Sequence, residues 1–211
     1  YSLTTYSLEE RIARDAILDL KLDVVVDVVD ATNLDRNLYL TTQLLELGKP
    51  VVIALNMSDV AHAQGIAPDV RELSALLGCP VVETVGHRGK GVEALMDQII
   101  EGVRHPQRCH PPQVRYGDEI EQALEAIEGR IASLPADSRP LGPPRWLALK
   151  LLEGDETVAQ QVRDPSLREE AGRRAAAIAA HGRESVEAQI AEARYGFVSG
   201  VCQRVLRNSP Q

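Results

Sequence analysis

The four residues Asn56, Met57, Ser58 and Asp59 place an amide and a carboxylate at a spacing that could read a nucleobase. They follow an apolar run at residues 50–56, so we expect them at the end of a buried strand. The Asp59 carboxylate can accept two parallel hydrogen bonds, and guanine offers such a donor pair on N1 and its exocyclic amine. Adenine has no such pair, so this chemistry favours guanine.

The order Asn-Met-Ser-Asp matches the N-[KQM]-x-D element of guanine-nucleotide-binding proteins. In that interpretation Asn56 donates to guanine N7 and ties neighbouring loops together. The thioether stem of Met57 covers one face of the base. An Asx-type turn in which Asp59 caps the next segment explains the same four residues equally well.

A second loop favours the guanine interpretation. The strand-like run at residues 80–84 is followed by VGHRGKGVEAL, a glycine-rich turn that opens a helix. In guanine-nucleotide-binding proteins the equivalent loop offers a backbone N–H to guanine O6, and Val85, Gly86 and His87 stand in that place here. Only a backbone contact is expected, because the usual Ser and Ala are absent. The Gly-Lys-Gly run does not complete a phosphate loop, since neither Ser nor Thr follows the lysine.

Short apolar runs alternating with helical patterns predict an open α/β sheet made of βαβ units. Dense Val and Ile runs of this kind are typical of interior strands buried on both faces. The expected strands are residues 22–29, 50–56 and 80–84. The helical patterns lie at residues 7–20, 34–47, 68–77 and 91–103. Ligands bind beyond the carboxyl ends of such strands, which is where both loops lie.

The pattern changes after a proline-rich stretch. We expect an α/β domain at residues 1–104, a linker at 105–115 and an all-α domain at 116–207. The last part shows no strand pattern and places apolar residues on one helical face. That face contains Ile120, Leu124, Ile127 and Ile131, and Trp146 is expected in the core of the same helical bundle.

Composition excludes several classes of protein. The net charge of −8 argues against a nucleic-acid binder that works by neutralising phosphates. The three cysteines, Cys79, Cys109 and Cys202, lack metal-ligand spacing and are odd in number, so neither a metal site nor a disulfide scaffold is expected. No run is long and apolar enough to span a membrane, so a soluble chain is expected.

Five stretches carry a resemblance to the cytoplasmic N-terminal region of the ferrous iron transport protein B (FeoB) family. The match extends over nearly the whole chain, and two of the stretches lie in the helical half, which general guanine-nucleotide-binding domains lack. The stretches are YSLTTYSLEERIARD (1–15), VVDATNLDRNLYLTTQLLELGKPVVIALNMSD (28–59), RGKGVEAL (88–95), RWLALKLLEGD (145–155) and ARYGFV (193–198).

The resemblance implies the C-terminal half of a Ras-like P-loop GTPase domain, followed by a small helical domain resembling a nucleotide-dissociation inhibitor. It implies GTP or GDP as ligand, and Mg²⁺ whose ligands lie outside this chain with the phosphate loop. GTPase activity is then expected of the intact protein and not of this chain alone, in which no catalytic residue is assigned. Loss of half the parallel sheet would expose its central strands. The trailing part of the second switch would comprise Tyr1, Ser2, Leu3, Thr4, Thr5, Glu9 and Glu10.

The function implied is that of a GTP-binding regulatory region coupling nucleotide binding and hydrolysis to uptake of Fe²⁺ at the cytoplasmic face of the bacterial inner membrane. Implied partners are guanine nucleotide, the transporter's own membrane domain, further copies of the chain and small Feo accessory proteins. One alternative is a non-catalytic interaction fragment that docks through the helical face at residues 120–131. A dinucleotide-binding enzyme is disfavoured, because no GxGxxG follows a strand.

Overall fold

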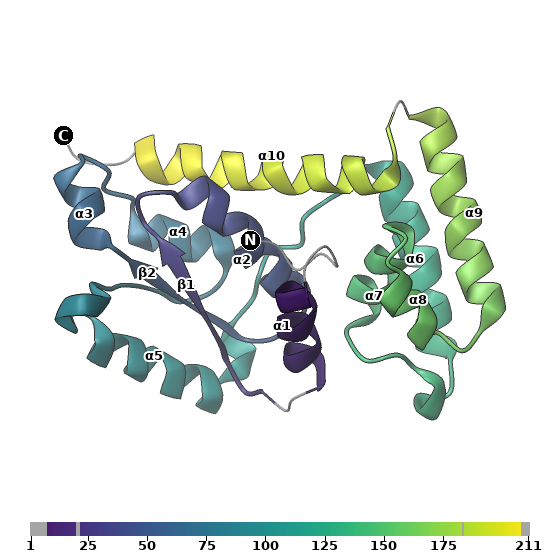
Figure 1. Cartoon of the computed structure of the whole chain (residues 1–211), viewed down its shortest axis with the longest axis horizontal. Helices are drawn as coiled ribbons and strands as arrows, with labels where there is room; N and C mark the ends of the chain where they lie inside the picture. The colour runs from purple at the N-terminus through teal and green to yellow at the C-terminus, as the bar shows by residue number, and fades with distance from the viewer. Residues whose placement is uncertain (1–7, 20–21, 183, 208–211) are drawn as a thin grey trace. The chain divides into compact units, whose positions relative to one another are not determined.

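The computed structural model describes residues 8–19, 22–182 and 184–207, which divide into two compact units (Figure 1). The sheet unit comprises residues 22–113 and 196–207, and the helical unit comprises residues 8–19, 114–182 and 184–195. This division differs from the sequence-based domains in three places, one of which is the predicted linker at 105–115, divided between the units after Gln113. Helix α1 (Leu8–Asp19) groups with the helical unit, and the end of α10 (Val186–Arg207) groups with the sheet unit.

Three parallel strands form the sheet in the order β1-β2-β3, which confirms the predicted parallel arrangement. They are β1 (Val25–Asp30), β2 (Val51–Asn56) and β3 (Val81–Glu83). Strand β1 starts three residues later than the apolar run that predicted it. The register sets Asp30 beside Asn56 and Leu55 beside Glu83, so the carboxyl ends of all three strands lie at one edge.

Helices cover both faces of the sheet, with α5 on one side and α2 and α4 on the other (Figure 1). Their bounds are Leu34–Glu46 for α2, Val70–Leu77 for α4 and Val92–Arg104 for α5. The short helix α3 (Ser58–Ala63) was not predicted from the sequence. Two 3₁₀ turns complete the unit, η1 (Gly86–Arg88) and η2 (Pro106–Arg108).

Burial differs sharply between the two longer strands. Residues 51–55 of β2 are all buried, as an interior strand requires. In β1, by contrast, Val26 is 39% exposed and Val28 is 61% exposed, so the prediction that this run is buried on both faces is wrong. Val26 and Val28 alternate with the buried Asp27 and Val29, so one face of β1, an edge strand among the described residues, is left uncovered.

The helical unit is built from α6 (Asp118–Ser133), α7 (Pro144–Leu152), α8 (Glu156–Gln161) and α9 (Pro165–His181), together with α1, the 3₁₀ turn η3 (Ala136–Ser138) and the first part of α10. Its core confirms the predicted helical face, whose four residues are each no more than 1% exposed. Trp146, on α7, is 2% exposed and also lies in the core as predicted.

Buried ion pairs hold α1 and α10 in this unit. The Arg14 guanidinium on α1 lies 2.7 Å from the Asp155 carboxylate, and both side chains are almost fully buried. The Glu153 carboxylate lies 2.6 Å from both Lys150 and Arg194, the latter on α10. Breaking one partner of such a pair leaves an uncompensated buried charge, so these contacts strongly favour the observed packing.

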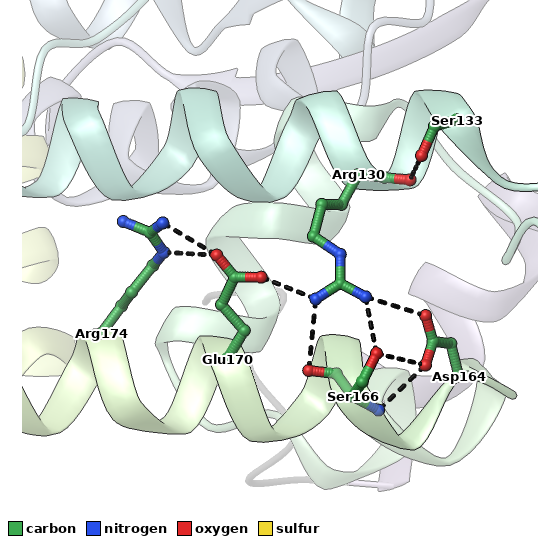
Figure 2. Close-up of polar contacts among 6 residues, drawn as sticks. All are labelled: Arg130, Ser133, Asp164, Ser166, Glu170 and Arg174. Carbon is green, nitrogen blue, oxygen red and sulfur yellow. Dashed lines mark hydrogen bonds and ion pairs between the residues drawn. The ribbon is translucent and has the colours of Figure 1, made fainter.

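A partly exposed network joins α6 to α9 (Figure 2). The Arg130 guanidinium donates to Glu170 at 2.7 Å, to Asp164 at 3.0 Å and to the Ser166 hydroxyl at 2.6 Å. Asp164 also caps the start of α9 by accepting the Ser166 N–H at 2.9 Å. Hydrogen bonds from Ser166 lower the pKa of Asp164, and those from Arg130 and Arg174 lower the pKa of Glu170. Since solvent screens the network, it orients the two helices and adds little stability.

Replacement of Gly78 by alanine tests the close approach of the chain at the start of β3. Gly78 has φ +63°, and a Cβ there would lie 2.0 Å from the His110 carbonyl oxygen. Gly65→Ala is the matched control, since Gly65 has φ +76° but no atom within 4 Å of the added Cβ. We expect the free energy of unfolding, measured by hydrogen exchange of the β2 amides, to fall by about 3 kcal/mol in Gly78→Ala and by about 1 kcal/mol in Gly65→Ala. Equal losses would contradict the steric argument.

Replacement of Glu153 by glutamine tests the buried charges of the helical unit. Lys150 and Arg194 would lose their shared carboxylate, and we expect the free energy of unfolding to fall by about 3–5 kcal/mol. Denaturation followed by Trp146 fluorescence reports on this unit, because Trp146 is the only tryptophan in the sequence. Glu128→Gln is the control; Glu128 pairs with Arg145 at 3.5 Å near the surface and its loss should cost at most about 1 kcal/mol.

The same residue predicts a pH dependence. Burial alone would raise the pKa of Glu153, but Lys150 and Arg194 together hold it below its ordinary value of 4.5. Stability from this carboxylate is therefore present above pH 4.5 and is lost as the pH falls toward the lowered pKa. The denaturation midpoint, measured by Trp146 fluorescence, should fall on acidification in the parent chain. It should fall less steeply in Glu153→Gln. An identical pH dependence in both would show that Glu153 is not part of the effect.

Candidate functional site

The candidate site begins where β2 ends. Asn56 is the last residue of the strand, and Met57 turns the chain with φ +59°. Among the described residues, Met57 is the only non-glycine with a positive φ. Such a conformation is uncommon for a residue with a side chain and is found most often where function constrains the backbone. The turn directs Ser58 and Asp59 into the first turn of α3.

Hydrogen bonds lock this segment, the NMSD loop (residues 56–59), to the glycine loop (residues 84–91) that follows β3. The Asn56 side-chain oxygen accepts the Gly86 N–H at 3.0 Å and the Thr84 hydroxyl at 3.4 Å. Ser58 makes a second connection between the loops. Its hydroxyl donates to the Thr84 carbonyl at 3.1 Å, and its N–H donates to the same carbonyl at 3.4 Å. The two loops therefore form one unit, as the sequence-based role of Asn56 anticipated.

The glycine loop is closed on itself. Val85 donates its N–H to the Lys90 carbonyl at 3.0 Å, and the 3₁₀ turn η1 lies between them. Gly91 ends the loop with φ +80°, and a Cβ there would lie 2.1 Å from the Glu83 carbonyl oxygen. Only glycine fits this position, so the loop returns tightly to the start of α5.

Asp59 is partly exposed at the rim formed by the two loops. One carboxylate oxygen accepts the Val60 N–H at 3.0 Å, a local contact that favours the turn interpretation of the motif. The other lies 3.7 Å from an Arg88 guanidinium nitrogen. The Asp59 side chain is 26% exposed and that of Arg88 is 68% exposed, so the carboxylate remains reachable by a ligand.

The structure brings together the residues that the sequence singled out for guanine. Met57, Gly86 and His87 are exposed, whereas Val85 is buried and contributes only its backbone. The Gly86 N–H, expected to donate to guanine O6, is donated to Asn56 here. Arg88 was missed from the sequence; the signal was a cation one residue beyond the predicted base-contacting segment. The role of these residues in guanine binding stays a prediction.

The residues predicted for the second switch cannot be placed in the same way. Tyr1, Ser2, Leu3, Thr4 and Thr5 lie outside the described residues. Glu9 and Glu10 fall within α1, but their side chains are likewise outside what the structure describes.

The described residues show neither a metal-binding cluster nor a membrane-spanning helix. In the part of the chain that the structure describes, no group of three or more His, Cys, Asp or Glu side chains could hold a metal ion. Among the same residues, no helix combines the length and apolar character that crossing a bilayer demands.

Family models match both halves of the chain. The model described as ferrous iron transport protein B matches residues 1–99, and the model described as FeoB cytosolic helical domain matches residues 116–207. These matches confirm the resemblance found in the sequence.

Curated relatives are much longer than this chain. The Fe(2+) transporter FeoB of Escherichia coli K12 is 40% identical over 212 residues, which cover 97% of this chain and 26% of the relative. The FeoB of Salmonella typhimurium LT2 is 46% identical over 159 residues, which cover 74% of this chain and 20% of the relative. A Porphyromonas gingivalis protein described as a fusion of Fe(2+) transport protein A and FeoB is 40% identical over 99% of this chain and 26% of its own length. The chain thus spans a fifth to a quarter of these relatives.

Solved structures of FeoB cytosolic regions are similar to this chain as well. A crystal structure of S. thermophilus NFeoB bound to mGMPPNP has a TM-score of 0.85 and 35% identity, covering all of this chain and 78% of that chain. The cytosolic domain of L. pneumophila FeoB has a TM-score of 0.79 and 31% identity, covering 97% and 76%. The predicted Ras-like α/β fold followed by a helical domain is therefore confirmed.

Replacement of Asn56 by alanine tests the lock between the loops. The Gly86 N–H would lose its acceptor, so we expect its hydrogen exchange to accelerate about two- to tenfold. The Val85 amide, which donates to Lys90, serves as an internal control. Asn37→Ala is the matched variant, because the Asn37 side chain donates to the Asn33 carbonyl in the same unit and not to either loop. An unchanged Gly86 rate in Asn56→Ala would contradict the lock.

Proposed function

Because the chain belongs to the FeoB family of ferrous iron transport proteins, we propose that its sheet unit recognises the base of GTP and GDP. Its helical unit passes the nucleotide state to an Fe²⁺-transporting membrane domain. The observation that carries base recognition is the lock between the NMSD and glycine loops, which presents Asp59 at the carboxyl edge of the sheet.

The residues of the two loops divide the work of base recognition. Asp59 accepts the N1–H and the exocyclic amine of guanine, which adenine cannot imitate. The Asn56 side chain donates to guanine N7. Met57, exposed in its left-handed turn, covers one face of the guanine ring. Guanine O6 competes with the Asn56 oxygen for the Gly86 N–H, so base binding and loop geometry are coupled. Solved relatives bound to GDP and to mGMPPNP support guanine nucleotide as the ligand.

Hydrolysis and Mg²⁺ binding belong, in this proposal, to the intact protein. No described residue is assigned to either. The phosphate-binding parts of the intact protein supply that chemistry, and Tyr1–Thr5, Glu9 and Glu10 form the trailing part of the switch that responds to it. GTP binding and its hydrolysis order and release the switches, and the change reaches the membrane domain through the helical unit.

The partners follow from the transporter context. The full-length relatives named Fe(2+) transporter FeoB support a membrane domain as the partner, with this region at the cytoplasmic face of the bacterial membrane. The relative that fuses transport protein A to FeoB supports a small accessory protein as a second partner. Further copies of the same chain complete the partners that the family resemblance implies.

The structure does not support the alternative of an interaction fragment that docks through residues 120–131, because the proposed docking face is not exposed. Ile120, Leu124, Ile127 and Ile131 are buried within the helical unit itself. A partner could reach them only by unfolding the bundle, so this face supports packing and not docking.

Replacement of Asp59 by asparagine in the full-length protein tests base recognition. An amide places a donor where guanine also donates, so we expect GDP and GTP binding to weaken about tenfold or more. Xanthine nucleotide should gain affinity, because its 2-carbonyl accepts a hydrogen bond. Titration with labelled nucleotides measures both changes.

The control for this experiment is Asp97→Asn, an exposed carboxylate on α5. It should leave every affinity unchanged. A parent protein that binds ATP as tightly as GTP would overturn the proposed function, and an unchanged base preference in Asp59→Asn would overturn the role of Asp59.

A further inference from the structure

The contact between Arg88 and Asp59 has no part in the base recognition proposed above. It joins a guanidinium on the glycine loop to the carboxylate oxygen that is not used by the Val60 N–H. We propose that Arg88 is a positioning residue that competes with guanine for Asp59 and so weakens the binding of guanine nucleotides. This inference rests on the proposed function and names a regulation of the same site.

The backbone holds both partners in place. Arg88 ends the 3₁₀ turn, and its own N–H donates to the Val85 carbonyl at 2.9 Å. Ser58, beside Asp59, donates to the Thr84 carbonyl at the other end of the same loop. Because the two loops are locked together, the Arg88 side chain stays within reach of the carboxylate whenever the loops keep this geometry.

Competition follows from the shared carboxylate. Guanine offers two donors to Asp59, N1–H and the exocyclic amine, and so makes one hydrogen bond to each carboxylate oxygen. Arg88 lies 3.7 Å from one of those oxygens, and its positive charge weakens both hydrogen bonds by offsetting the charge of their acceptor. Hypoxanthine keeps N1–H but lacks the exocyclic amine, so Arg88 weakens one hydrogen bond to hypoxanthine and two to guanine.

The size of the effect follows from exposure. Arg88 is 68% exposed and the two groups are separated by more than hydrogen-bond distance, so the ion pair is weak and screened by salt. We therefore expect removal of Arg88 to tighten GDP binding about two- to fivefold. The affinity for inosine diphosphate should rise less, so the ratio of the GDP affinity to the inosine diphosphate affinity rises.

The test compares Arg88→Gln with Lys90→Gln in the full-length protein, with labelled GDP and inosine diphosphate as probes. Lys90 lies on the same loop and is exposed, and no ion pair is recorded for it among the described residues, so its loss controls for the general positive potential. Raising the salt concentration should increase the GDP-to-inosine ratio of the parent protein toward that of Arg88→Gln and leave the ratio of the variant unchanged. Phosphate contacts cancel in this ratio, because both probes carry the same diphosphate.

The outcomes separate this inference from the proposed function. A parent protein without guanine preference over adenine overturns the proposed function. If guanine preference is present, unchanged or weaker GDP binding in Arg88→Gln overturns the competition alone. An equal gain for both probes, or the same gain in Lys90→Gln, also overturns it, because the effect would then come from net charge. A gain that is larger for GDP than for inosine diphosphate, is absent in Lys90→Gln and is lost at high salt supports it.

Discussion

The hydrogen bond from the Gly86 N–H to the Asn56 side chain is the constraint on which the candidate site depends. It crosses from the loop after β3 to the end of β2, two points 30 residues apart in the sequence. With the Ser58 contacts to Thr84, it turns two separate loops into one surface. Asp59 and Arg88 face one another only because this surface exists. The buried strand β2 supplies the rigid base from which the surface is built.

The balance of charge differs between the two units. In the helical unit, Glu153 is enclosed with two cations and its charge is fully compensated inside the protein. In the sheet unit, Asp59 has one exposed cation at a longer distance. The first arrangement stabilises one packing, because breaking it strands a buried charge. The second leaves a carboxylate that can exchange partners at little cost, which is what a reversible ligand site requires.

Much of this architecture could be read from local sequence. The dense Val and Ile runs predicted the parallel sheet, and the residues following β2 and β3 predicted where the candidate site lies. The six-residue helices α3 and α8 were missed, because each is too short to show a helical period. The exposure of Val28 depends on what packs against that face of β1, and strand pattern alone does not contain that information.

Other features depend on contacts that no local pattern records. Helix α1 groups with the helical unit because Arg14 pairs with Asp155, 141 residues further along the chain. The donation of the Gly86 N–H to Asn56, and the approach of Arg88 to Asp59, likewise need the two loops in three dimensions. The residue types of the site could be read from the sequence. Which of these groups already contact one another, as the Gly86 N–H contacts Asn56, depends on the folded structure.

The sheet unit is discontinuous in sequence, because the end of α10 belongs to it. The Val205 carbonyl on this helix accepts the Asp69 N–H at 3.0 Å at the start of α4, and Arg204 pairs with Glu72 in the first turn of α4. During synthesis, therefore, the sheet unit cannot be completed until the whole helical unit has left the ribosome. The last turns of α10 close a unit whose strand β1 was made about 180 residues earlier, the sequence separation between the start of β1 and the end of α10.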